Sequence, residues 1–207
     1  MKVIQSFNTF EGERMTAGFK TKRAMLDYLS ESYEIHKHYD YMMYTDIHGA
    51  ELLKKVIAEN HITIIDFPLI ARDRIPYIGK FIAQIHQTKP YIHVDIDAKL
   101  LVLPINHADV YCEKLEGRSF GYEVADLEIN TSGINEIPCS ALIGFTDMHF
   151  KDLYINEVYK LIELSSKIHG LNYKHCWAIE EVKLAEMILT YKKTVSATKN
   201  EHLHSEK

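Results

Sequence analysis

Short apolar segments that alternate with helical segments of about 10–15 residues constrain the fold of this chain most strongly. Runs with strand character lie at residues 3–7, 41–44, 61–65, 91–94, 108–113, 122–129 and 141–145. Helical patterns lie between and after them, at residues 21–33, 50–58, 75–87, 155–168 and 177–191. This alternation is typical of β-α-β units, in which parallel strands form one sheet and helices cover its faces. The sequence therefore predicts an α/β fold with a mostly parallel central sheet flanked by helices.

The chain length and the absence of an internal repeat or linker favour one domain. A length of 207 residues is ordinary for a single domain. From residue 194 onward the sequence is polar and lacks an apolar period. We therefore predict a single domain over residues 1–193 and a disordered polar tail over residues 194–207.

Composition and charge exclude several classes of protein. The net charge of -5 does not favour nucleic acid as a partner, because proteins that bind phosphate backbones normally carry a basic surplus. No run approaches the ~18 apolar residues of a membrane span, and the N-terminus lacks the apolar stretch of a signal peptide. Cys112, Cys139 and Cys176 are isolated, which indicates a reducing compartment. We expect a cytoplasmic location.

The strongest local signal for chemistry is a pair of carboxylates directly after an apolar strand. The run at residues 91–94 leads into Asp95-Ile96-Asp97. Open α/β sheets bind ligands beyond the carboxyl ends of their strands, so this spacing would bring both carboxylates to the binding edge. Such carboxylates suit Mg²⁺ or Mn²⁺, and a bound cation can neutralise the charge that builds on a departing diphosphate. The alternative interpretation is a strand end whose two acids lie in solvent.

Residues 91–100 resemble the Asp-x-Asp segment of the GT-A class of glycosyltransferases, and are closest to small bacterial and phage glycosyltransferase-like families. Further segments follow in matching order: residues 1–7 for the opening strand, residues 44–49 for the second strand and its turn, residues 78–90 for the helix before the Asp pair, and residues 108–110 for the strand after it. The resemblance covers roughly residues 1–190, and its one sharp motif is the Asp pair.

The resemblance implies a function and a set of ligands. It implies transfer of a sugar from a nucleotide diphosphate sugar to an unknown carbohydrate or other hydroxyl acceptor, with Mn²⁺ or Mg²⁺ as cofactor. In such enzymes the first Asp contacts the ribose or metal-bound water and the second ligates the metal. Asp95 and Asp97 are therefore the candidate metal residues, and Asp95 is also a candidate for nucleotide binding.

Three further residues are candidates for the site, Glu180 by the same resemblance and Asp46 and Lys80 by their positions, each with a competing interpretation. Asp46 follows another strand and would face the same edge, or it caps the next helix. Lys80 would meet a phosphate, or it lies on the surface with its ammonium in water. Glu180 would act as a catalytic base or positioning group for the acceptor, or it is a favourable charge at a helix start. Gly79 would allow close helix packing without a ligand role.

Some positions depart from the family pattern or resist assignment. Ser140 stands where family members often carry Asn in the acceptor region. A late His completes the metal shell of some GT-A enzymes, and His169 or His175 would fill that place. His93 lies inside the strand before the Asp pair, so we expect it to pack in the core or to support a ligand. The remaining histidines lack a ligand spacing, and we interpret the two in the tail, His202 and His204, as incidental.

Two other functions remain open at this point. The first is a catalytically silent protein of the same fold that binds a nucleotide or sugar. The second is a phosphohydrolase of the haloacid dehalogenase type, which also uses Asp-x-Asp after an apolar strand, with the first Asp as nucleophile. In that class the motif normally lies near the N-terminus, whereas here it begins at residue 95.

Overall fold

The computed structural model describes residues 1–8, 21–66, 78–100, 102–104, 107–117, 127, 129–169, 173–198 and 200–202. The helices are α1 (Lys22–His36), α2 (Ile47–Leu53), the 3₁₀ helix η1 (Glu59–His61), α4 (Ile78–Ile85), α5 (Met148–His169) and α6 (Tyr173–Tyr191). The strands are β1 (Lys2–Phe7), β2 (Asp40–Thr45), β3 (Ile62–Ile64), β4 (Tyr91–Val94), β5 (Ala98–Leu100), β6 (Val110–Cys112), β7 (Leu115–Glu116), β8 (Ile137–Pro138), β9 (Leu142–Phe145), β10 (Val195–Ala197) and β11 (Asn200–His202).

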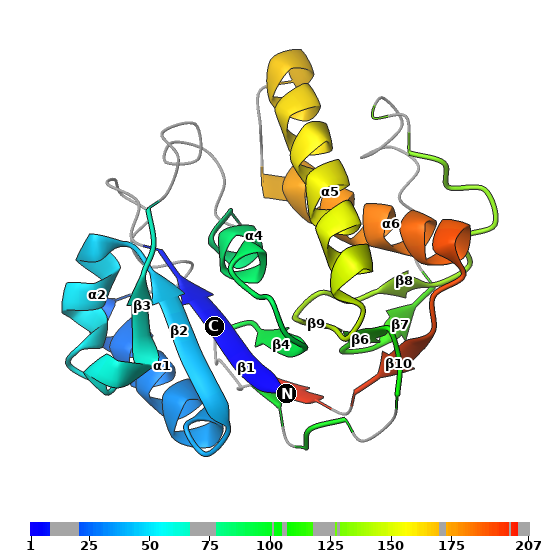
Figure 1. The fold of residues 1–207 in the computed structure, drawn as a ribbon. Helices are drawn as coiled ribbons and strands as arrows, with labels where there is room; N and C mark the ends of the chain where they lie inside the picture. The colour runs from blue at the N-terminus through cyan, green and yellow to red at the C-terminus, as the bar shows by residue number, and fades with distance from the viewer. Residues whose placement is uncertain are drawn as a thin grey trace.

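A seven-stranded sheet in the order β10-β6-β9-β4-β1-β2-β3 forms the centre of the molecule (Figure 1). Only β9 runs against its neighbours β4 and β6, and the other pairs in this sheet are parallel. Two short antiparallel pairs, β11 with β5 and β7 with β8, lie beside it. The predicted α/β fold with a mostly parallel sheet is confirmed. Because β4 occupies the middle position, the Asp pair that follows it lies at the centre of the carboxyl edge.

Helices cover both faces of the sheet, as the alternation of side chains along β1 requires. Val3 packs into a cluster with Leu29 of α1 on one face. Ile4 packs on the other face with Phe81 of α4 and Ile179 of α6. Figure 1 shows α4, α5 and α6 above the sheet and α1 beneath it. Two buried cores therefore cover the two faces of β4 and β1.

Helix α4 is held close to the end of β1 and to α5. A Cβ added to Gly79 would lie 1.8 Å from the side-chain amide of Asn8, so the predicted packing role of this glycine is confirmed. At the other end of α4, the ammonium group of buried Lys151 donates hydrogen bonds to the carbonyl oxygens of Gln84 at 3.5 Å and Gln87 at 2.9 Å. These carbonyls lie at the helix end, where partners within the helix run out. Both contacts fix the helix that carries Lys80.

The C-terminal segment differs from its prediction. Val195 pairs with Val110 in β10, and the backbone of His202 pairs with Ala98 in β11. The prediction of a disordered tail from residue 194 onward is therefore wrong for residues 195–197 and 200–202, while residues 199 and 203–207 lie outside the described part. The error has a physical cause: strands at a sheet edge gain backbone hydrogen bonds without needing an apolar period.

The helix boundaries also differ from their prediction because of capping. Helix α2 begins at Ile47 instead of residue 50, since the Asp46 carboxylate accepts a hydrogen bond from the Gly49 N–H at 2.6 Å. Helix α5 begins at Met148 instead of residue 155, and Asp147 accepts from the Phe150 N–H at 2.9 Å.

Most of the predicted strand at residues 122–129 lies outside the described residues. Among the described helices, none combines the length and apolar character needed to span a bilayer.

Candidate functional site

Asp95 and Asp97 project from one tight turn at the carboxyl end of β4. The Ala98 N–H donates to the Asp95 carbonyl at 3.0 Å, which closes the turn, and the Asp95 N–H donates to the Ala141 carbonyl at 2.8 Å. The Asp95 side chain is 29% exposed, whereas Asp97 is exposed. The structure thus brings both predicted metal residues together at the edge, as the spacing predicts.

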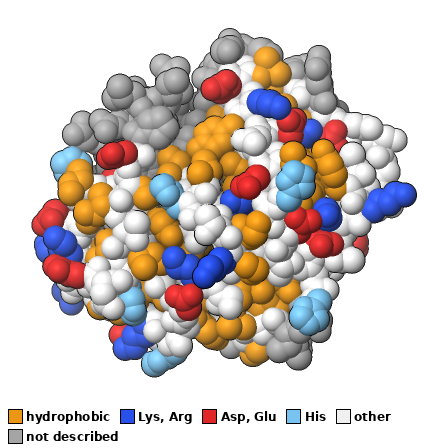
Figure 2. Space-filling view, viewed as in Figure 1, with side chains coloured by type: hydrophobic (Ala, Val, Ile, Leu, Met, Phe, Trp, Pro, Cys, Tyr) orange, Lys and Arg blue, Asp and Glu red, His pale blue; other side chains and the backbone are white. Residues whose placement is uncertain are grey.

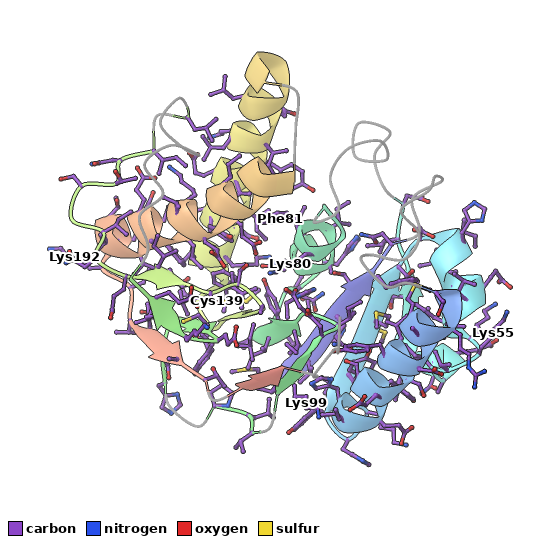
Figure 3. The ribbon with its side chains drawn as sticks, turned by 180° about the vertical axis from the view of Figure 1, so that it is seen from behind. Lys55, Lys80, Phe81, Lys99, Cys139 and Lys192 are labelled. Atoms are coloured by element: carbon purple, nitrogen blue, oxygen red, sulfur yellow. The ribbon has the colours of Figure 1, made fainter. Side chains whose placement is uncertain are left out.

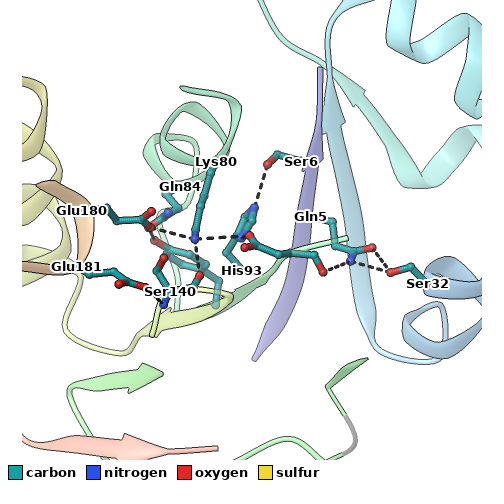
Figure 4. A network of polar contacts seen from close by, with 11 residues as sticks. Gln5, Ser6, Ser32, Lys80, Gln84, His93, Ser140, Glu180 and Glu181 are labelled. Carbon is teal, nitrogen blue, oxygen red and sulfur yellow. Dashed lines mark hydrogen bonds and ion pairs between the residues drawn. The ribbon is translucent and has the colours of Figure 1, made fainter. Parts of the chain in front are cut away.

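A buried ammonium group links Asp95 to the opposite side of the site. Lys80 of α4 is 3% exposed, and its Nζ lies 3.5 Å from Asp95 Oδ1 and 3.0 Å from Glu180 Oε1 (Figure 4). The same ammonium donates to the carbonyl oxygen of Ser140. Figure 3 shows Lys80 beneath α4, while Lys55 and Lys192 lie at the periphery. The interpretation of Lys80 as a surface residue is therefore wrong.

Glu180 lies in the interior of α6 and is 1% exposed. Helix α6 begins at Tyr173, well before residue 177, so the alternative of a helix-start charge is wrong. Although Glu180 pairs with Lys80, neither of its carboxylate oxygens has a partner in hydrogen-bond geometry among the described residues. An unbonded buried carboxylate is costly, so the charge of Lys80 is what makes the position tolerable.

The charges of these groups depend on one another. Burial raises the pKa of Asp95 to about 7, and Glu180 and Asp97 add to the rise while Lys80 opposes it. Burial also raises the pKa of Glu180, again against the effect of Lys80. Burial alone would lower the pKa of Lys80, but Asp95 and Glu180 together hold it above its ordinary value. Lys80 is therefore the cation that opposes protonation of both buried carboxyl groups.

Ser140 joins β9 to α6 at this edge. It is 5% exposed, and its N–H donates to Glu181 Oε1 at 2.9 Å while its carbonyl accepts from Lys80. Its backbone makes both contacts, so neither depends on the identity of the Ser140 side chain. Any acceptor contact by its hydroxyl stays a prediction.

His93 of β4 lies beside the Asp95 side chain without a hydrogen bond to it. It is 1% exposed, its Nε2 lies 3.0 Å from Ser6 Oγ, and its Nδ1 lies 3.6 Å from Asp95 Oδ1. The order Ser-His-Asp resembles that of a nucleophilic relay, but 3.6 Å is too long for a hydrogen bond. Burial and the Lys80 ammonium also hold the pKa of His93 well below its ordinary range, which makes it a poor base. The predicted position of His93 in the core is confirmed, and its support of a ligand stays a prediction.

The cysteines near the site are not activated. Cys139 Sγ donates to Glu113 Oε2 at 3.0 Å, and Cys112 is buried. Burial raises the pKa of both thiols to about 12, and Glu113 adds to each rise. Since the thiolate is the nucleophile, neither cysteine is suited to attack a substrate near neutral pH.

Sequence reasoning missed a second polar network, on the face of the sheet that carries α1. Gln5 of β1 donates to the Asp95 carbonyl at 3.3 Å and to Ser32 Oγ at 2.9 Å, and it accepts from the Tyr41 hydroxyl at 2.9 Å (Figure 4). His36 Nδ1 lies 2.8 Å from the Ser32 carbonyl. These residues lie at ordinary strand and helix positions. The one sequence feature that indicates the network is Gln5, a polar residue at an inward-facing position of β1.

Asp46 lies apart from this group. Its carboxylate caps α2, which confirms the alternative interpretation of a helix cap. It follows β2, which is two positions from β4 in the sheet, so about 10 Å of strand spacing separates it from Asp95. Direct nucleotide binding by Asp46 stays a prediction.

The donor set fits a divalent cation that is bound mainly by substrate and water. Within the described residues, no three His, Cys, Asp or Glu side chains are arranged to hold a metal by themselves. Mg²⁺ and Mn²⁺ commonly use one or two carboxylates and take their other ligands from phosphate and water, which the pair Asp95 and Asp97 allows. The side chains of His169 and His175 lie outside the described part. The register of β11 instead places the backbone of His202 opposite Ala98, next to Asp97.

One hollow of the described surface lies away from this site. A hollow of about 360 Å³ lies at the amino-terminal edge of the sheet, with Lys2, His86 and Pro90 in its lining, and it contains none of the predicted site residues. On the face shown in Figure 2, acidic and basic side chains are interspersed.

Comparisons with known proteins place the chain by fold. No family model and no curated protein matches the sequence. A nucleoside-diphosphate-sugar pyrophosphorylase from Vibrio cholerae RC9 has a similar structure, with a TM-score of 0.50 and 12% identity over 96% of this chain and 91% of that one. An inositol-1-phosphate CTP transferase from T. maritima (TM-score 0.49, 10% identity, 99% and 89% covered) and the galactosyltransferase LgtC in complex with donor and acceptor sugar analogs (0.49, 11%, 95% and 73%) are also similar. Structures similar to this chain thus include nucleotidyltransferases as well as glycosyltransferases, the class that the sequence resembles, and the likeness concerns the fold alone.

Removal of the buried cation tests the electrostatic account of the site. We expect Lys80→Met to lower the free energy of unfolding by about 3–5 kcal/mol at pH 7.5, because it leaves Glu180 as an uncompensated buried charge. Glu180→Gln added to Lys80→Met should restore part of the loss, since it removes that charge. Urea unfolding measures both, with exposed Lys55→Met as the control. A Lys80→Met loss below about 1 kcal/mol, or no recovery in the double variant, would contradict the account.

The buried His36 predicts a specific dependence of stability on pH. Burial lowers the pKa of His36 to about 4, against the opposing effect of its hydrogen bond to Ser32. The unfolded chain therefore binds a proton that the folded chain rejects, so stability is lost as the pH falls from 6.5 toward 4. Relative to His36→Gln, we expect the parent to lose about 2 kcal/mol between pH 7.5 and pH 5. Parallel stability curves for the two proteins would show that His36 does not titrate in this way.

Proposed function

We propose that this protein is a transferase that moves a sugar from a nucleotide diphosphate sugar to a hydroxyl acceptor, with a divalent cation bound by Asp95 and Asp97. One observation carries the proposal: both carboxylates project from a single turn at the carboxyl end of the central strand. That edge is where open α/β sheets bind nucleotides. The fold, shared with a nucleoside-diphosphate-sugar pyrophosphorylase, supports a ligand of that class.

Asp97 and Asp95 would have different roles because their side chains differ in exposure to solvent. The exposed Asp97 is free to ligate Mn²⁺ or Mg²⁺ directly, whereas Asp95 is 29% exposed and contacts Lys80. Asp95 is therefore the better candidate for metal-bound water or a ribose hydroxyl. The cation, when bound, supplies positive charge for the diphosphate that leaves. Lys80 favours the ionised form of Asp95 and adds a positive charge near the same edge.

Glu180 fits a supporting role better than direct proton transfer. With 1% exposure, its carboxylate lacks the access that a base for an acceptor hydroxyl needs. Its ion pair with Lys80 at 3.0 Å instead fixes the ammonium that faces Asp95. We therefore propose Glu180 as a positioning group, which is one of the two roles that the sequence resemblance allows.

Nucleotidyl transfer is the second candidate function. The similarity to the Vibrio cholerae pyrophosphorylase, with a TM-score of 0.50, favours it, because that fold handles the same class of ligand. In this reaction a sugar phosphate attacks a nucleoside triphosphate and pyrophosphate leaves, so the released product differs from that of sugar transfer. A silent binding protein would bind the ligand and release neither product. The phosphohydrolase alternative is favoured less, since the Asp pair follows the fourth strand among the described residues and does not lie near the N-terminus.

Ligand-dependent stabilisation tests the metal and nucleotide site. We expect nucleoside diphosphates with Mn²⁺ to stabilise the parent by about 2–3 kcal/mol at a hundredfold excess over Kd, as measured by thermal shift. Asp97→Asn should abolish this gain. Asp27→Asn, which changes an exposed Asp on α1 that is 74% exposed, should retain it.

Product analysis on the same proteins separates the functions. Release of nucleoside diphosphate from a nucleotide sugar supports sugar transfer, and release of pyrophosphate from a nucleoside triphosphate with a sugar 1-phosphate supports nucleotidyl transfer. Binding without either product supports the silent protein, and hydrolysis of p-nitrophenyl phosphate supports the phosphohydrolase. Equal stabilisation of the parent and Asp97→Asn would refute the assigned site.

A further inference from the structure

We propose that Gln5 and His36 are positioning residues that hold the segment from Asp95 to Leu100 from the face of the sheet opposite to Lys80. The expected effect on ligand binding rests on the proposed function, whereas the fixed conformation of the segment does not. The segment carries both Asp95 and Asp97, so its shape determines how far apart the two carboxylates lie.

The first end of the segment is fixed by Gln5. Its side-chain amide donates to the Asp95 carbonyl at 3.3 Å, and Gln5 is fully buried. The Tyr41 hydroxyl at 2.9 Å and Ser32 Oγ, within 2.9 Å and 3.2 Å of the two amide atoms, hold that amide in one orientation. Since Lys80 contacts the Asp95 side chain from the other face, the turn is held by contacts on both faces of the sheet.

The second end of the segment is fixed by His36. The Leu100 N–H donates to His36 Nε2 at 3.0 Å, and His36 Nδ1 faces the Ser32 carbonyl at 2.8 Å. A carbonyl can only accept and an N–H can only donate, so the ring must be neutral with its proton on Nδ1. His36 is 0% exposed, and its ring stacks with Tyr41 at 6.5 Å between centroids.

The two contacts share one helix turn. Ser32 and His36 lie four residues apart on α1, so one face of this helix reaches Gln5 and Leu100 together. The contact at Leu100 also joins a strand of only three residues, β5, to the body of the protein. Buried polar groups whose hydrogen bonds are all made favour a single conformation. Here the hydrogen bonds fix the distance between Asp95 and β5.

Hydrogen exchange combined with ligand binding tests the inference. The variants are His36→Leu, which removes both ring contacts, and His36→Gln, whose amide oxygen can accept from Leu100. Leu29→Ala is the control, because Leu29 is a buried α1 residue without a polar contact to the segment. We expect His36→Leu to raise amide exchange over residues 96–100 about tenfold and to weaken Mn²⁺-dependent binding of a nucleoside diphosphate about tenfold.

His36→Gln should stay near the parent in both readouts, and Leu29→Ala should lower Tm without either local effect. If His36→Leu does not fold, Ser32→Ala gives the milder test through the Gln5 amide. Unchanged exchange over residues 96–100 would overturn the inference, as would parent-like binding in a variant whose segment exchanges faster. If the parent itself binds no nucleotide, the proposed function fails, and the exchange data alone decide whether Gln5 and His36 hold the segment.

Discussion

A single buried ammonium group organises the carboxyl edge of this sheet. Lys80 lies within 3.5 Å of Asp95 and 3.0 Å of Glu180 and is itself 3% exposed, so an ammonium group and two carboxyl groups share one largely buried space. Such an arrangement is stable only when each charge has its counterpart, because an isolated buried charge costs several kcal/mol. Helix α4, β4 and α6 must therefore keep their mutual positions. The same requirement holds Asp95 in place at the edge.

The fold meets this requirement from two sides. Residues alternate along β4, so His93 and Asp95 face α4, while the Asp95 carbonyl is within reach of Gln5 on the α1 face. The turn that presents Asp97 to solvent is thus attached to both cores. A site that binds a cation and a phosphate gains from such rigidity, because ordering costs are met during folding and not at binding.

Sequence patterns predicted the parts of the structure that depend on local periodicity. The parallel strands, the helices that alternate with them and the turn with Asp95 and Asp97 follow from the apolar runs and from the positions where these runs end. The burial of Lys80 could not be predicted, since it depends on Glu180, a residue 100 positions away whose approach is set by tertiary packing. The pairing of residues 195–197 escaped prediction because edge strands need little apolar sequence.

The central claim is that a cation and a diphosphate bind at the turn after β4, where Asp95 and Asp97 lie together. Anomalous diffraction from crystals grown with Mn²⁺ and a nucleoside diphosphate tests it most directly. We predict a manganese peak within coordination distance of the Asp97 carboxylate, with the diphosphate on its far side and Lys80 still beside Asp95. Manganese and nucleotide bound elsewhere, with the Asp97 carboxylate free, would contradict the account.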